Sequence, residues 1–371
     1  MACNASDPVA GDLVARAMLS TCRQSTKGRS MRHGMRLLVA VALAAAVAGC
    51  SAEKSAGGDL TVRNCDVDVR FPTPAQRLFV NDGNLISMVL ALGAQDQTVA
   101  VSSVQRDADT LRRHYGPVVD QLKSVAPEYP SRETVLAQGP DVMVAGWSYG
   151  YDEAKNLTPD SLQKAGIAAY TLTESCRQRN GERPRGIVEP WTALRTDLTN
   201  LGAITGRTER AAEVTADLDQ RLTALHAAPQ AERKPTIFLF DSATDSLMSS
   251  GSFGAPQAIL DAAGGRNVLS DVPDTWTRVS WERLAAADPD AIMFVDYPPQ
   301  TFAQKLDALR SKPGINQLRA VTEGRFLNLP YAMWTSGPLN IDAAEQIRKQ
   351  LERWNLVPAS TIEPRADDAI R

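Results

Sequence analysis

The stretch that decides the fold reads SRETVLAQGPDVMVA at residues 131–145, and its pattern recurs as SWERLAAADPDAIMFV at residues 280–295. Each copy contains Ser-x-Glu, six further residues, Pro-Asp and an apolar run. Serine is a good N-cap, and glutamate in the first turn suits the positive end of the helix dipole. Pro-Asp ends the helix, and the apolar run predicts a buried strand. One helix–turn–strand unit is therefore expected in each half of the protein.

Strands and helices alternate on both sides of these two units. Strands are expected at residues 77–80, 98–101, 142–145, 169–172, 236–240, 291–295 and 326–329, and helices at residues 85–92, 133–138, 161–165, 208–227, 256–263 and 343–354. Such alternation predicts an α/β fold with largely parallel sheets flanked by helices. The longest helix, 208–227, lies midway between the halves and is expected to bridge two lobes.

The length of the chain favours two lobes, because about 320 residues after the leader exceed one comfortable core. The expected order is a leader and signal peptide at 1–49, a tether at 50–64, a first lobe at 65–205, an interlobe helix at 206–230, a second lobe at 231–358 and a polar tail at 359–371. The tail is polar enough that we expect no fixed structure there.

The N-terminal sequence predicts export. Arg32 and Arg36 precede the apolar run 37–48, which is too short to span a bilayer, and Ala48-Gly49-Cys50 closes it. A cysteine directly after Ala-Gly resembles a bacterial lipobox, in which that cysteine is lipidated and becomes the mature N-terminus. The sequence thus predicts a protein anchored by Cys50 to the outer face of the cell membrane. Translation can start at Met1, Met31 or Met35.

The net charge argues against nucleic acid as a partner. The whole chain has 40 Lys+Arg and 43 Asp+Glu, a formal charge of −3. Residues 1–49 carry six basic and two acidic side chains, so the part from Cys50 onward has a formal charge of −7. Nucleic-acid binding calls for a basic face, which a mildly acidic chain does not favour.

Two cysteines remain once Cys3 and Cys22 leave with the leader and Cys50 takes lipid. Cys65 and Cys176 are then an even pair in an oxidising compartment. We expect a disulfide that ties the N-terminal segment to the first lobe. The alternative is two separate buried thiols.

A secreted esterase is an alternative function. Gly146-Trp147-Ser148-Tyr149-Gly150 fits G-x-S-x-G after a strand, as a nucleophile elbow would. The His of such a triad follows the Ser, and the only later His is His226, at the end of the long charged helix. Because a serine without a general base is a weak nucleophile, the sequence favours a protein that is not an enzyme.

Direct metal binding is also disfavoured. His114 and His226 are far apart in the sequence and lack the spacing of metal ligands. We therefore expect no metal site and no cofactor.

Aromatic side chains follow several of the expected strands. In open α/β sheets ligands bind beyond the carboxyl ends of strands, where Trp and Tyr give flat apolar walls with a polar handle. Such a cleft suits a bulky, partly aromatic or chelated ligand. The candidate ligand-binding residues are Trp147, Tyr149, Trp276, Arg278, Tyr297, Tyr331 and Trp334.

The chain from about Cys65 to Trp354 resembles the substrate-binding lipoproteins of ABC importers that take ferric siderophores, haem or cobalamin. The resemblance rests on residues 77–93, on both Ser-x-Glu…Pro-Asp units and on residues 262–267. It implies two α/β lobes bridged by one long rigid helix, with the ligand cleft between them. It also places Trp147 and Trp276 at positions that resemble cleft positions of the family.

In that family two glutamates dock into arginine pockets on the permease, and by motif position these are Glu133 and Glu282. The sequence departs from relatives at residues 86–88, Ile-Ser-Met, where a Glu is often present. The resemblance implies a monomeric carrier that takes an iron chelate to a permease, with iron arriving already chelated. The alternative within the family is a cobalamin or haem carrier.

Overall fold

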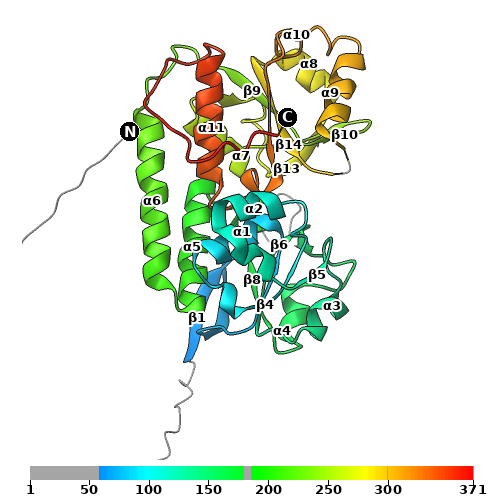
Figure 1. Ribbon diagram of the computed structural model, residues 1–371. Helices are drawn as coiled ribbons and strands as arrows, with labels where there is room; N and C mark the ends of the chain where they lie inside the picture. Colours follow the sequence, from blue (N-terminus) through cyan, green and yellow to red (C-terminus); the bar gives the residue numbers. More distant parts are fainter. Residues whose placement is uncertain (1–57, 179–184, 299, 371) are drawn as a thin grey trace, which may run out of the picture. The chain divides into compact units, whose positions relative to one another are not determined.

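The computed structural model describes residues 58–178, 185–298 and 300–370 (Figure 1). The expected leader, the Cys50 of the expected lipobox and most of the expected tether lie outside these ranges. Within them, no helix combines the length and apolar character needed to cross a membrane.

The first lobe is built on a six-stranded parallel sheet. Its strands run in the order β5-β4-β3-β6-β7, and β8 pairs with β6. Because helices cover both faces, these strands are almost wholly apolar. Val80 and Val144 pack with Leu85 on one face, whereas Phe79 and Met143 pack with Val135 on the other. The bounds are β3 Leu78–Asn81, β4 Thr98–Ser102, β5 Ser124–Ala126, β6 Val142–Trp147, β7 Gly150–Tyr151, β8 Ala168–Thr171, α1 Gly83–Ala91, α2 Ala108–Tyr115, α3 Arg132–Ala137 and α4 Pro159–Gln163, with short 3-10 helices η1 Gln95–Gln97, η2 Gly116–Gln121 and η3 Thr173–Ser175.

The second lobe repeats this plan with a four-stranded parallel sheet in the order β12-β9-β14-β15. A smaller antiparallel sheet, β10-β11-β13, accompanies it. The two lobes therefore have the α/β architecture that the sequence predicts. The bounds are β9 Thr236–Phe240, β10 Ser242–Ala243, β11 Leu247–Ser250, β12 Arg266–Asn267, β13 Trp276–Val279, β14 Ala291–Asp296, β15 Phe326–Pro330, α7 Ala255–Ala262, α8 Trp281–Ala287, α9 Phe302–Ser311, α10 Arg319–Thr322, η4 Tyr331–Met333 and α11 Asn340–Arg353.

The two Ser-x-Glu…Pro-Asp units are equivalent in structure. Ser131 Oγ caps α3 by accepting the amide of Thr134, and Ser280 Oγ caps α8 by accepting the amide of Arg283. The strand that follows pairs with the first parallel strand of its own lobe, β6 with β3 and β14 with β9. The predicted repeat is therefore confirmed as one helix–turn–strand unit in each lobe.

The aspartate of each Pro-Asp pair has a structural role. Asp141 accepts the backbone amides of Gln76 and Arg77 at 2.8 and 3.1 Å, just before β3. Asp290 accepts the amide of Thr236, the first residue of β9, at 2.8 Å. In both lobes this carboxylate satisfies donors where the neighbouring strand begins, and it thereby fixes the register between the two strands.

The long helix that the sequence predicts between the lobes is paired with a second helix that it did not predict. The long helix is confirmed as α6, Thr208–Ala227. It packs along α5, Pro190–Thr205, and the two lie side by side in Figure 1. Gly206 ends α5 in the left-handed conformation, with φ of 70°. A Cβ on Gly202 would lie 2.5 Å from Cβ of Ala211, so glycine permits the close approach of the two helices.

The described chain begins with a β-hairpin that the sequence did not predict. β1, Gly58–Asn64, pairs with β2, Val67–Thr73, so the expected tether is wrong for residues 58–64. Cys65 and Asp66 form the turn with φ of 48° and 62°, as a two-residue hairpin of this hand requires. Val62 is buried, which gives this short polar stretch the apolar contact that orders it.

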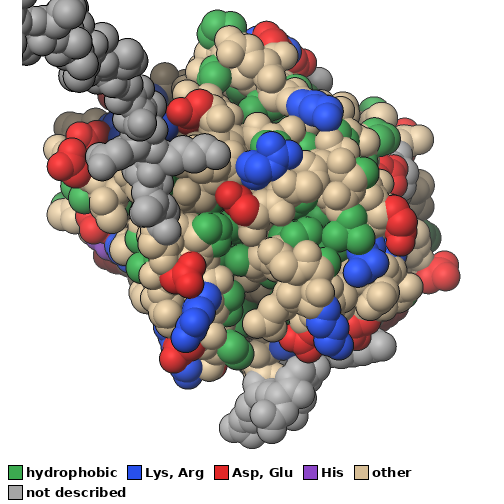
Figure 2. Space-filling view, turned by 90° about the horizontal axis from the view of Figure 1, so that it is seen from below, with side chains coloured by type: hydrophobic (Ala, Val, Ile, Leu, Met, Phe, Trp, Pro, Cys, Tyr) green, Lys and Arg blue, Asp and Glu red, His purple; other side chains and the backbone are tan. Residues whose placement is uncertain are grey.

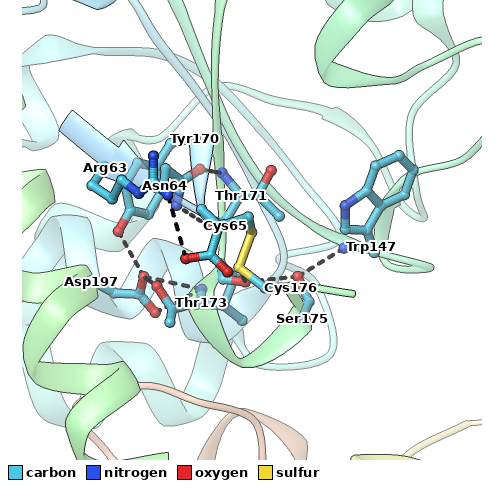
Figure 3. The surroundings of a disulfide bond; sticks show 12 residues. Arg63, Asn64, Cys65, Trp147, Tyr170, Thr171, Thr173, Ser175, Cys176 and Asp197 are labelled. Carbon is cyan, nitrogen blue, oxygen red and sulfur yellow. Dashed lines mark hydrogen bonds and ion pairs between the residues drawn. A yellow bond between two sulfur atoms is a disulfide. The ribbon is translucent and has the colours of Figure 1, made fainter. Parts of the chain in front are cut away.

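The disulfide joins this hairpin to the segment after β8 (Figure 3). Cys65 and Cys176 are bonded, with Cα atoms 5.2 Å apart and 111 positions between them in sequence. Beside the bond, the side-chain amide of Asn64 donates to Thr171 O and accepts from Thr171 N, both at 2.8 Å. Asn64 thus pairs with β8 as a strand residue would and holds the hairpin against the edge of the sheet.

The C-terminal tail is ordered, contrary to the expectation for residues 359–371, through residue 370. Asp368 is buried and pairs with Arg113 and His114 of α2 at 2.9 and 3.0 Å. The amide of Ile370 donates to Asn328 O in β15. Composition predicted a solvated tail, but specific ion pairs to helices distant in sequence fix it in place.

Candidate functional site

Three residues with left-handed backbone follow three neighbouring parallel strands of the first lobe. Asp82, Ser103 and Ser148 come directly after β3, β4 and β6, with φ of 80°, 57° and 67°. This conformation costs free energy for residues with a Cβ, and such residues cluster at functional sites. They lie at the carboxyl edge of the sheet, where ligands bind in open α/β folds. This edge is the candidate site.

The second lobe faces this edge with the residues that follow β15. The hydroxyl of Tyr331 donates to Asp82 Oδ2, and the backbone amide of Ala332 donates to Asp107 Oδ1; each donor–acceptor distance is 3.0 Å. The amide of Ser336 donates to Glu174 Oε2 over 2.9 Å. We call the carboxylates Asp82, Asp107 and Glu174, with the segment 331–336 that they hold, the interlobe clasp.

A guanidinium occupies the centre of an aromatic group contributed by both lobes. Arg106 pairs with Asp82, and its Cζ lies over the rings of Tyr129, Tyr297 and Tyr331 at 5.7, 5.0 and 4.6 Å. The rings of Tyr297 and Tyr331 are in contact in a tilted arrangement, with centroids 4.7 Å apart. A cation over an aromatic face is attracted by the ring quadrupole, so this arrangement holds the Arg106 side chain between the lobes.

Burial governs the electrostatics of the clasp. Burial and the neighbouring charge of Asp82 raise the pKa of Asp107 to about 7, although Arg106 opposes the shift. Burial also raises the pKa of Glu174 to about 7, against the influence of Arg185. The pKa of Tyr331 lies well above its ordinary value because the hydroxyl is buried beside Asp82. The tyrosine therefore acts only as a neutral hydrogen-bond donor.

Buried polar atoms without a protein partner gather at this boundary. Among the described residues no hydrogen bond reaches Asn84 Oδ1, Ser103 Oγ, Glu174 Oε1 or Ser336 Oγ. Buried polar atoms nearly always have a partner, which can be water or a ligand. Both lobes contribute such atoms, so the boundary is equipped to bind small polar groups.

Two of the candidate tryptophans are joined by a residue that the sequence did not reveal. Arg185 donates to Trp147 O at 3.3 Å and to Trp276 O at 3.0 Å. The first tryptophan ends β6 and the second begins β13, so Arg185 ties the two lobes together at these positions. Both indoles are only half-buried.

Trp147 also faces away from the second lobe. Its ring lies beneath the guanidinium of Arg177, 3.9 Å from the ring centroid. It lines a cavity of about 800 Å³ whose other walls come from β2, α4 and the edge of β8. This cavity lies on the outer side of the first lobe rather than between the lobes.

The other candidate aromatic residues lie in different surroundings. Tyr297 and Tyr331 face the boundary, as described above, and Tyr149 is buried near Glu174. Trp334 is fully buried, and its indole donates to Phe294 O at 3.1 Å, which makes it a packing residue of the second lobe. Arg278 is exposed on β13 and donates to Ser246 Oγ.

The two candidate docking carboxylates occupy equivalent places. Glu133 and Glu282 are exposed in the first turns of α3 and α8. The pKa of each is lowered, chiefly by its own backbone amide and by the hydroxyl of Ser131 or Ser280. Both therefore remain ionised and available at the surface at neutral pH.

The geometry around Ser148 does not support an esterase. Ser148 lies in a tight turn between β6 and β7, not in the strand-to-helix turn of a nucleophile elbow. His114 is engaged by Asp368, and His226 lies in the last turn of α6.

Within the described ranges, no group of three or more His, Cys, Asp or Glu side chains could hold a metal ion.

The sequence did not identify the charged residues of this site, namely Asp82, Arg106, Asp107 and Glu174. Only Asp82 carried a signal, as part of the turn Asn81-Asp82-Gly83-Asn84. Arg106 lies in an ordinary loop, Asp107 is the residue directly before α2, and Glu174 lies in η3 without any motif.

Comparison with known proteins agrees with this architecture. Residues 82–332 match the family described as periplasmic binding protein. The vitamin B12-binding protein of Pectobacterium carotovorum is 25% identical over 285 residues, covering 74% of this chain and 88% of that protein.

Solved structures agree in fold. A protein of an ABC-type Fe3+-hydroxamate transport system from Saccharomonospora viridis has a TM-score of 0.66 at 24% identity, over 79% of this chain and 98% of that one. A periplasmic heme binding protein from Pseudomonas aeruginosa has a TM-score of 0.59 at 24% identity, over 79% and 95%.

Two α/β lobes, each with a largely parallel sheet and joined by a long helix, define the architecture of a two-lobed solute-binding protein. The chain belongs to the periplasmic binding protein family, in the class whose members serve ABC importers.

Proposed function

We propose that this protein captures an iron chelate of the ferric siderophore type outside the cytoplasm and delivers it to an ABC-type permease. The observation that carries the proposal is the boundary between the lobes, where aromatic rings and unpartnered polar atoms from both lobes face each other. A bulky chelate needs flat walls and several polar contacts, and this boundary offers both.

Iron would enter already coordinated, and the protein would contact only the chelator. A resemblance in fold to an Fe3+-hydroxamate transport protein supports this ligand class. A cobalamin carrier is the second candidate, favoured by the 25% identity with a vitamin B12-binding protein.

Delivery would use Glu133 and Glu282, one on each lobe. Arginines of the permease would pair with them and offset the loss of hydration, which makes the docked interface sensitive to salt. Lipid on Cys50 would keep the protein at the outer face of the membrane as a monomer. On the face drawn in Figure 2, the described Lys and Arg side chains are interspersed with Asp and Glu, so this face has no continuous basic surface of the kind that nucleic acid needs.

Intrinsic fluorescence tests the ligand. The chain contains six Trp, and Trp147 and Trp276 border the lobe boundary. We expect saturable quenching by ferric hydroxamate or ferric catecholate chelates, with weaker or no response to cyanocobalamin and haem. Saturation by cyanocobalamin alone would replace the iron chelate with the second candidate, and no response to any of these probes would refute both.

A further inference from the structure

The three carboxylates of the interlobe clasp are shielded from water by the contact between the lobes. Asp82 and Asp107 are fully buried, and Glu174 is 2% exposed. Each accepts a hydrogen bond from the segment 331–336 of the second lobe. Withdrawal of this segment would give all three carboxylates access to water.

The first two carboxylates share a single cation. Asp107 faces Arg106, whose Nε lies 3.6 Å from Oδ2, and it also faces Asp82 and Asp296. A Cβ on Gly83 would lie 2.2 Å from Oδ2 of Asp107, so this oxygen packs directly on the glycine backbone. With two carboxylates around one guanidinium, the group carries an excess negative charge in a place that solvent does not screen.

Glu174 has a similar environment at the other end of the segment. The charged and titratable groups that face it are Arg185, Asp197 and Tyr149. Its Oε1 has no hydrogen-bond partner among the described residues. An unpartnered carboxylate oxygen in a buried site favours the protonated form.

We propose that closure of the two lobes takes up protons at Asp107 and Glu174, so that acid tightens the interlobe clasp and alkali loosens it. This inference rests on the proposed function, because it names a regulation of the same ligand cleft. Backbone amides of Ala332 and Ser336 donate to these two side chains whether or not they are protonated, so the bonds survive while the charge is removed.

The direction of the pH dependence follows from the pKa of each carboxyl group in the closed and open forms. In the closed form the pKa of both groups is about 7 because they are buried. In an open form water solvates them, and the pKa falls toward the ordinary range of about 4. The closed form therefore binds more protons between about pH 4 and 7, and closure weakens as pH rises through this window. Each proton taken up changes the closure equilibrium by about tenfold per pH unit.

Hydrogen exchange of the ligand-free protein measures this equilibrium. Mass spectrometry would follow the amides of residues 331–336 from pH 5 to pH 8.5, with correction for the intrinsic exchange rate at each pH. We expect their protection factors to fall at least tenfold between pH 5 and 7 and then to level off. A flat profile in the wild-type protein would overturn the proposal.

Isosteric variants assign the protons. In Asp107→Asn with Glu174→Gln an acceptor oxygen remains but neither group titrates, so the profile should become flat. If Asp107→Asn does not fold, Glu174→Gln alone should reduce the steepness of the profile by about half. Wild-type pH dependence in whichever variant folds would refute the assignment.

Asp197 provides a matched control. It is fully buried, and burial raises its pKa to about 7, but its donors Tyr170 and Thr173 belong to the first lobe. Asp197→Asn should therefore keep the fall in protection of residues 331–336, moved only slightly to lower pH because Asp197 is one of the charges that face Glu174. Loss of that fall in Asp197→Asn would count against the clasp. The hydrogen-exchange experiment uses no ligand. A negative fluorescence test would therefore count against the proposed ligand without affecting the pH dependence of the clasp, and a flat exchange profile would count against the clasp without affecting the proposed ligand.

Discussion

The hydroxyl of Tyr331 donates a hydrogen bond to Oδ2 of Asp82 over 3.0 Å, and this bond joins two residues that are 249 positions apart. Asp82 begins α1 at the carboxyl end of β3, and Tyr331 follows β15 of the other lobe. Each residue thus follows a parallel strand of its own sheet. The carboxyl edges of the two sheets meet here, and this contact defines the boundary at which a ligand would bind.

Removal of this donor should weaken the contact. Tyr331→Phe leaves a buried carboxylate oxygen unpaired, so we expect the free energy of unfolding to fall by about 1–3 kcal/mol, measured in denaturant. Tyr115→Phe is the control, because its hydroxyl bonds only the neutral Ser87, at 2.7 Å, and its loss should cost about 1 kcal/mol. Equal effects of the two variants would show that the charge on Asp82 is unimportant.

The docking glutamates can be separated from ligand binding. Glu133→Ala with Glu282→Ala should abolish uptake in cells and leave ligand affinity unchanged, because both side chains are exposed in the first turns of short helices away from the lobe boundary. Glu209→Ala, in the exposed first turn of α6, should leave uptake normal. Normal uptake by the double variant would exclude docking through these residues.

The half-buried tryptophans should contribute to affinity. Trp276→Ala is expected to weaken chelate binding about tenfold or more, since a desolvated aromatic contact is worth at least about 1.4 kcal/mol. Trp147→Ala should have a smaller effect, because its ring lies under Arg177 on the outer side of the first lobe. Titration by equilibrium dialysis avoids dependence on the removed fluorophore. Trp354→Ala, at the end of α11, should leave affinity unchanged. Wild-type affinity in Trp276→Ala would place the ligand elsewhere.

Asp290, the aspartate of the second Pro-Asp pair, should make the free energy of unfolding decrease at acidic pH. Asp290 is buried, and although burial opposes the change, hydrogen bonds from Arg233 and Thr236 lower its pKa to about 2. A depressed pKa stabilises the fold above the unfolded pKa of about 4, and this contribution is lost as pH falls toward 2. Asp290→Asn should cost about 1–2 kcal/mol at pH 7 and progressively less below pH 4, measured by urea unfolding. An equal cost at pH 7 and pH 2.5 would contradict this explanation.

The disulfide should stabilise the protein mainly through its long loop. Its two cysteines are 111 positions apart, for which loop-closure entropy predicts about 5 kcal/mol. Cys65→Ser with Cys176→Ser should lower the free energy of unfolding, measured in denaturant, by this amount, and a reducing agent should affect the wild type but not the variant. A variant as stable as the wild type under oxidising conditions would show that Asn64 and the hairpin strands suffice.

Hydrophobic periodicity, together with helix caps and the Gly and Pro residues that end elements, predicted most of the longer helices and strands. The longer strands of both sheets and the long helix α6 were visible because each is a continuous apolar run or stripe bounded by Gly, Pro or a cap. The short strands β5, β7 and β12 and the helices α2 and α9 were not expected. The hairpin β1–β2 and helix α5 were missed. The hairpin is polar and short, and it is ordered by Asn64 and the disulfide, which are contacts distant in sequence.

The sequence by itself determined the α/β repeat, because helix capping, the Pro-Asp break and apolar strands are local properties of residues 131–145 and 280–295. It also identified exposed Glu133 and Glu282 as equivalent, since equal spacing gives equal positions. Only the tertiary structure decided the site. Asp82, Asp107 and Glu174 are buried against a segment more than 150 residues away in the sequence, and this burial decides their electrostatics. A local sequence pattern cannot predict which charged side chains become buried when two lobes meet.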